Sequence, residues 1–113
     1  ARGGMNRTGA RAERRARLFY LLRGYRVLEA NSRPGRVEVD LILRRGRRIV
    51  FCEVKAKLGS RFGDPGEMVG WAKQERLRRA AEAWLAARPE SAEWEVRFDV
   101  VAVTPRGVGA GGP

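Results

Sequence analysis

Residues 36–57 read RVEVDLILRRGRRIVFCEVKAK. Two runs in which apolar residues alternate with others flank the basic sequence RRGR, and this pattern predicts two antiparallel strands joined by a tight turn. Side chains alternate along a strand, so Glu38 and Asp40 share one face of the first strand, while Glu53 and Lys55 share one face of the second. The stretch therefore predicts a hairpin with three carboxylates and one amine, and their chemistry depends on whether the two faces coincide.

The other side chains of the hairpin define its apolar faces. Those expected together on the first strand are Val37, Val39, Leu41 and Leu43. On the second strand, Ile49 and Phe51 share the face of Glu53, and Val50, Cys52 and Val54 share the other. Cys52 is therefore expected to pack as a small apolar residue.

The remaining chain predicts two helices and two further strands. Helical spacing of apolar residues and flanking glycine and proline signals predict helices over residues 8–23 and from residue 67 or 68 to 87. Strands are expected at residues 25–30, 37–43, 48–55 and 93–103, with a turn at 31–35 and a mobile loop at 59–70. The order is αβββαβ, an α/β fold with a mixed sheet flanked by helices, in which a right-handed crossover makes the last two strands parallel.

The 113 residues, 43% of them apolar, suffice for one core. The sequence predicts a single domain at residues 8–104, with residues 1–7 and the Gly-rich residues 105–113 as flexible ends.

Charge and composition limit the function. The net charge is +11, and all 24 basic residues are arginines except Lys55, Lys57 and Lys73. Genomic base composition can favour arginine without a functional demand, but it does not explain the net charge, which indicates a polyanionic partner, best fitted by nucleic acid. The absence of histidine excludes imidazole-based metal sites and Ser-His-Asp machinery, and one cysteine excludes an internal disulfide. Without an apolar run of membrane-spanning length or a visible signal peptide, a cytoplasmic protein is expected.

Carboxylates on adjacent strands are suited to Mg²⁺, and a lysine beside them can orient water or stabilise charge on a phosphorus undergoing attack. A cross-strand salt bridge is the simpler reading of Glu53 and Lys55. Glu13 likewise reads as a partner for Arg17 one helical turn away, and Lys73 as a lysine whose stem covers the edge of the core.

The sequence resembles the bacterial UPF0102, or YraN-like, family over residues 9–103. The resemblance rests on Asn31, the run 38–42 (EVDLI), the run 51–55 (FCEVK), the run 62–65 (FGDP), Lys73 and the run 97–101 (RFDVV). The family is similar to the PD-(D/E)xK nucleases and, within them, to archaeal Holliday junction resolvases. Two departures are Val37, where the family usually has glycine, and the absence of a proline ahead of Asp40.

The resemblance implies a restriction-endonuclease-like core, a divalent metal (Mg²⁺ or Mn²⁺) and phosphodiester cleavage. By position, Asp40 and Glu53 correspond to metal ligands and Lys55 to the catalytic lysine. Glu13 corresponds to the first-helix acid of the resolvase branch and is a further candidate metal ligand. Glu38 and Lys73 are further candidates for the catalytic group.

The resulting hypothesis is a metal-dependent endonuclease acting on DNA, with branched or junction DNA as a candidate substrate. Cutting two symmetry-related strands would suit a two-fold homodimer. The phosphate contacts expected are Arg44, Arg45, Arg47 and Arg48. The rival hypotheses are a non-catalytic nucleic-acid-binding module with the same fold, and a net charge that serves solubility alone.

Overall fold

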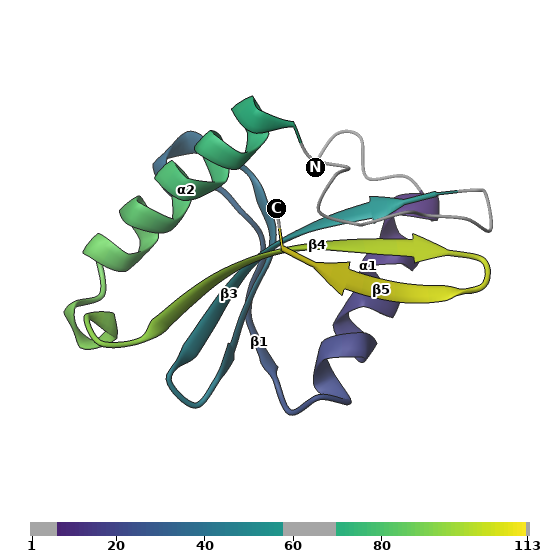
Figure 1. Cartoon of the computed structure of the whole chain (residues 1–113), viewed down its shortest axis with the longest axis horizontal. Coiled ribbons are helices and arrows are strands. Elements are labelled where there is room, and N and C mark those ends of the chain that lie inside the picture. Colours follow the sequence, from purple (N-terminus) through teal and green to yellow (C-terminus); the bar gives the residue numbers. More distant parts are fainter. Residues whose placement is uncertain (1–6, 58–69, 113) are drawn as a thin grey trace.

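One mixed sheet with helices on both sides forms the body of the protein (Figure 1). The computed structural model describes residues 7–57 and 70–112. The elements are α1 (Arg7–Leu21), β1 (Arg26–Ser32), the 3₁₀ turn η1 (Pro34–Arg36), β2 (Val39–Arg45), β3 (Arg48–Ala56), α2 (Trp71–Ala86), the 3₁₀ turn η3 (Pro89–Ser91), β4 (Glu95–Thr104) and β5 (Gly107–Gly111). Among the described residues, no helix is both long and apolar enough to cross a lipid bilayer. Residues 1–6 of the expected flexible N-terminus and residues 59–69 of the expected mobile loop lie outside the described ranges.

The strand order is β1-β2-β3-β4-β5. The hairpin predicted at the centre is present, since β2 and β3 pair antiparallel, and β3 and β4 pair parallel across the connection through α2. The predicted αβββαβ order and mixed α/β sheet are therefore confirmed, with one strand added at the end.

That added strand corrects the prediction of a flexible end at residues 105–113, as far as the structure describes it, to residue 112. Gly107–Gly111 pairs antiparallel with Val100–Thr104 as β5. The Thr104 hydroxyl accepts hydrogen bonds from the backbone N–H groups of Arg106 and Gly107, which closes the turn. A glycine-rich strand shows little alternation of side chains, but its backbone supplies the same ladder donors and acceptors as any other residue.

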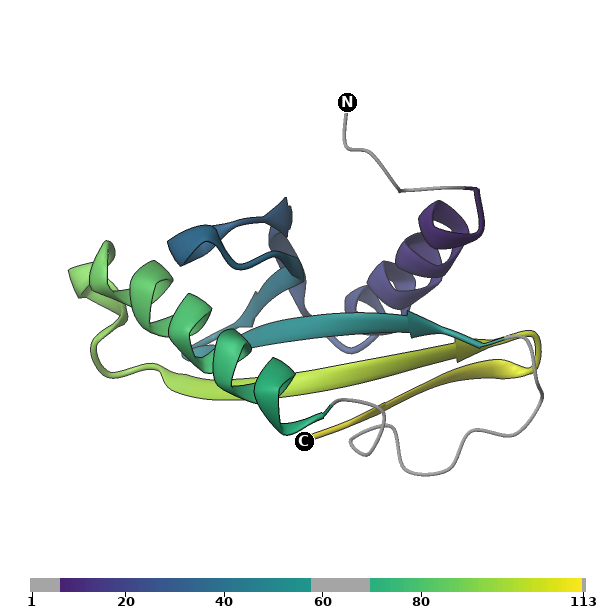
Figure 2. The same ribbon diagram turned by 90° about the horizontal axis from the view of Figure 1, so that it is seen from above.

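The two helices lie on opposite sides of the sheet (Figure 2), and each packs on it through one apolar cluster. The α1 cluster includes Ala12, Ala16 and Tyr20 of α1, and the α2 cluster includes Leu77, Ala80 and Trp84 of α2. Cys52 is buried in the α1 cluster, as expected for a small apolar side chain. The α1 cluster also takes Leu41 and Leu43, but Val37 and Val39 pack in the α2 cluster. The prediction that all four share one face is therefore wrong. The two-residue alternation of side chains is interrupted between Val39 and Leu41, at Asp40.

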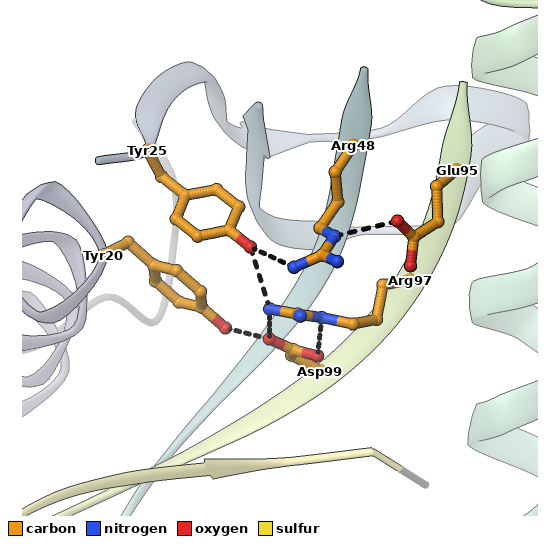
Figure 3. Close-up of polar contacts among 6 residues, drawn as sticks. All are labelled: Tyr20, Tyr25, Arg48, Glu95, Arg97 and Asp99. Atoms are coloured by element: carbon orange, nitrogen blue, oxygen red, sulfur yellow. Dashed lines mark hydrogen bonds and ion pairs between the residues drawn. The ribbon is translucent and has the colours of Figure 1, made fainter. Parts of the chain in front are cut away.

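A partly buried polar network ties α1 and the following turn to β4 (Figure 3). The hydroxyl of Tyr20, on α1, donates to Asp99 Oδ2 at 2.5 Å, and Arg97 donates to both oxygens of that carboxylate at 3.0 and 3.1 Å. The hydroxyl oxygen of Tyr25 accepts from Arg97 and Arg48 at 3.2 and 3.3 Å. Burial raises the pKa of Tyr20, so the hydroxyl stays a donor. No sequence pattern indicated this network, and Arg48, predicted as a phosphate contact, is part of it.

Candidate functional site

Asp40 lies where the hairpin opens. The β2–β3 register ends at the pair Leu41–Cys52, so Asp40 is the first residue beyond it. Its Oδ2 accepts a hydrogen bond from the backbone N–H of Val54 at 2.8 Å, which takes the place of a ladder bond. The carboxylate is thereby held in the split between the two strands rather than on a regular sheet face.

Glu53, on β3, is the buried acid of the site, with 7% of its surface exposed. Lys55 Nζ lies 3.6 Å from its Oε2, and Lys73 Nζ, from the first turn of α2, lies 3.4 Å from its Oε1. The structure thus brings both predicted lysines to this acid. Two ammonium groups offset the unfavourable burial of one carboxylate.

Asp40 and Glu53 line a common cavity of about 240 Å³ together with Glu13 on α1. Burial and the negative charge of Glu53 raise the pKa of Asp40 to about 6, with a further contribution from Glu38. The N–H of Val54 and the charge of Lys73 act in the opposite direction. The two carboxylates therefore repel each other, and a cation between them would relieve that repulsion.

Glu13 and Glu38 are the two other predicted acids near Asp40 and Glu53, and each has an arginine partner. Glu13 Oε2 lies 3.0 Å from Arg17, the helical partner that the sequence suggested, and its Oε1 accepts from Asn31 Nδ2 at 3.2 Å. Glu38 Oε1 lies 3.7 Å from Arg33. Glu13 thus has both the simpler role and a place at the cavity.

The donor set fits Mg²⁺ or Mn²⁺ on a pair of carboxylates. Within residues 7–57 and 70–112, no three His, Cys, Asp or Glu side chains are arranged to hold a metal ion, so Glu13 does not complete a three-acid group with Asp40 and Glu53. Mg²⁺ commonly takes only one or two protein carboxylates and fills its remaining positions with water and substrate phosphate. The side chains of Lys55 and Lys73, 42% and 31% exposed, have room to turn from Glu53 toward a bound phosphate.

The predicted phosphate contacts form a separate group at the closed end of the hairpin. Arg45 and Arg48 are about five residues along their strands from Asp40 and Glu53, which corresponds to about 17 Å. The Arg44 guanidinium stacks 3.8 Å from the Trp94 ring centroid, and Arg45 donates to the carbonyl of Arg23. Arg48 bonds Tyr25 and Glu95 (Figure 3). Arg47 is exposed at the turn.

Comparison with known proteins assigns the chain to a family. A model of the "Uncharacterised protein family UPF0102" matches residues 12–103. The chain belongs to the UPF0102 family. This UPF0102 chain is 42% identical over 100 residues to UPF0102 proteins of Bradyrhizobium diazoefficiens and Agrobacterium fabrum, covering 88% of this chain and 74% and 80% of theirs. It is 39% identical over 98 residues to a UPF0102 protein of Nitrobacter winogradskyi, covering 87% and 81% of the two chains.

The family predicted from sequence is therefore confirmed. The UPF0102 match contains every predicted site residue, from Glu13 to Lys73. The names of these relatives state the family and no activity. The function of the UPF0102 chain is accordingly inferred from its site.

Proposed function

We propose that this protein is a metal-dependent endonuclease that hydrolyses DNA phosphodiester bonds in the cytoplasm. The observation that carries the proposal is the Asp40–Glu53 pair in one cavity with two lysines on Glu53. A net charge of +11 supports a polyanionic substrate. The arrangement is similar to that expected of PD-(D/E)xK nucleases.

The roles of the side chains follow from their positions. Asp40 and Glu53 would hold Mg²⁺ or Mn²⁺, with Glu13 adding negative charge at the cavity wall. Bound there, the cation would polarise a phosphoryl oxygen and lower the pKa of its water. Lys55 would orient the attacking water or stabilise charge on the phosphorus, and Lys73 would contact a phosphate oxygen. Glu38 would act through its charge on Asp40.

Cleavage of DNA by purified protein is the direct test. With Mg²⁺ or Mn²⁺, we expect hydrolysis of linear, flapped or four-way DNA, and no hydrolysis in EDTA. Lys55→Ala should lower the cleavage rate on the order of 10²- to 10³-fold, because it removes the ammonium group that would stabilise negative charge developing on the reacting phosphate. Preference for the four-way substrate, with a two-fold dimer in solution, would support junction cleavage. No cleavage of any substrate would contradict the proposal.

The second candidate is a nucleic-acid-binding module with the same fold but no catalysis. An ammonium group contacts each oxygen of Glu53, so the charge of this carboxylate is neutralised without a metal. That observation favours the binding module. Calorimetry separates the two functions. A binder shows salt-sensitive DNA affinity and no Mn²⁺ site, whereas the nuclease shows an Mn²⁺ site that Asp40→Asn removes.

A matched pair of arginine variants tests the closed end of the hairpin as a DNA surface. Arg47→Ala should weaken DNA binding, make its salt dependence shallower by about one phosphate contact, and leave stability unchanged. Arg48→Ala should shift the urea midpoint down, because Arg48 bonds Tyr25 and Glu95. The measurements are DNA titrations at several salt concentrations and urea unfolding. An unchanged salt slope in Arg47→Ala would remove the turn from the interface.

A further inference from the structure

Asn31 has a strained backbone beside the candidate site. Its φ of 53 lies in the left-handed region, which asparagine tolerates better than most residues but still unfavourably. The residue types at 31–35 predicted a turn there, whereas Asn31 lies inside β1. Its two neighbours in β1 pair with the two neighbours of Asp40 in β2, so Asn31 and Asp40 face each other across the strands.

The side chain of Asn31 is only half satisfied. Its Nδ2 donates to Glu13 Oε1 at 3.2 Å, and a carboxylate accepts only, so this contact sets the orientation of the amide. Its Oδ1 is buried and, within the described part of the chain, accepts no hydrogen bond. Unsatisfied buried polar atoms are rare in native proteins and point to a partner such as water, an ion or a ligand.

Backbone strain and an unpartnered oxygen thus coincide at one residue, which links Glu13 on α1 to the strand position facing Asp40. Strained residues and unpaired polar groups concentrate at functional sites, where the surrounding structure holds them in place. Glu13 and Asp40 also line the same cavity. Asn31 is not among the described residues that line this cavity, so its link to it is the contact with Glu13. Holding Glu13 in place accounts for both features, because a structure keeps strain and an unpaired oxygen where the residue has such a role.

We infer that Asn31 is a positioning residue of the divalent-cation site: from a strained backbone opposite Asp40, its Nδ2 holds the Glu13 carboxylate at the cavity. The inference rests on the proposed function, because it requires a cation at Asp40 and Glu53.

Titration with Mn²⁺ alone, followed calorimetrically, tests the inference without any measurement of cleavage. Asn31→Gly removes the amide and accepts the left-handed backbone. We expect about 10- to 100-fold weaker Mn²⁺ binding, as found when partners around a metal site are lost. The thermal midpoint of the cation-free protein should change little, because the variant also removes an unsatisfied buried oxygen.

A charge-exchanged pair provides the control. Asn31→Asp alone places two carboxylates against each other and should weaken Mn²⁺ binding. Adding Glu13→Gln reverses the direction of the hydrogen bond, keeps an oxygen at position 31 and preserves the total charge, so most of the affinity should return.

The outcomes separate the two proposals. If the wild-type protein binds no Mn²⁺, the proposed function fails and the inference with it. If the wild type binds Mn²⁺ and Asn31→Gly binds it equally well, only the inference is overturned and Asn31 is structural. Should Asn31→Gly not fold, equal affinities of the single Asn31→Asp variant and the double variant would overturn the inference.

Discussion

Replacing Asp40 with asparagine should abolish cleavage and, at the same time, make the cation-free protein more stable at pH 8. The amide oxygen of asparagine can still accept from the N–H of Val54, so the local backbone contact is kept. The substitution removes the negative charge that the Glu53 carboxylate repels. We expect a loss of rate at least as large as that of Lys55→Ala, measured with Mg²⁺ on the same DNA.

The pH dependence of the stability difference follows from the raised pKa of Asp40, about 6 in the folded protein against 3.8 ordinarily. Between these values the folded state binds more protons than the unfolded state, so the contribution of Asp40 to stability falls as pH rises from 4 to 6. The resulting loss of folding free energy is at most about 3 kcal/mol. Solvent screening makes it smaller, because the carboxyl is partly exposed. Asp40→Asn should therefore be more stable than wild type above pH 6 and equal to it near pH 4.

Urea unfolding of both proteins at pH 4 and pH 8 measures this difference. Mg²⁺ should reverse its sign at pH 8, because the cation stabilises only the protein that binds it. Glu82→Gln is the matched charge control, because it also removes one negative charge, at an exposed position on α2 outside the carboxylate pair. A variant that is less stable than wild type at pH 8 without cation would show that Asp40 is a structural residue.

The largest effect on stability is expected at Asp99. Asp99→Ala should lower the free energy of unfolding by about 3 kcal/mol, because it leaves the buried hydroxyl of Tyr20 without its acceptor and removes the ion pair with Arg97. That is a large share of the roughly 5–15 kcal/mol that stabilises a typical domain. Cation-free urea unfolding at pH 7 gives the value.

Tyr20→Phe serves as the control for this network. It removes only the hydroxyl and should lower stability by about 1 kcal/mol. The double variant should be more stable than the sum of the two losses predicts, because the two groups contact each other. A loss below about 1 kcal/mol for Asp99→Ala would mean that other contacts hold α1 on the sheet.

The site was accessible from sequence because its parts are local. The hairpin joins Asp40 to Glu53 through one tight turn. Alternation along β3 placed Glu53 on the side of Ile49 and Phe51, which pack with α2, and Lys73 of α2 contacts Glu53. Helical spacing put Lys73 at the head of the apolar stripe of the second helix, and the structure brings it to that acid. The roles of these residues stay predictions until cleavage and Mn²⁺ binding are measured.

Two features escaped sequence reasoning because they depend on long-range contacts. β5 forms through backbone pairing, which a run of glycines does not signal. Three of the hairpin arginines are engaged with Trp94, the carbonyl of Arg23, and the pair Tyr25 and Glu95. Charge alone could not separate them from arginines available to phosphate.

By itself, the sequence determined the α/β class, the order of the elements and the hairpin that carries the acids, because these depend on short-range periodicity and turn chemistry. Only the tertiary structure decided how the acids meet. The strands separate beyond Leu41 and Cys52, Asp40 turns into the split to bond Val54, and α1 brings Glu13 to Asn31. The alternation of residue types along the strand does not predict this break at Asp40, because the break arises from the way β1, β2 and α1 pack together.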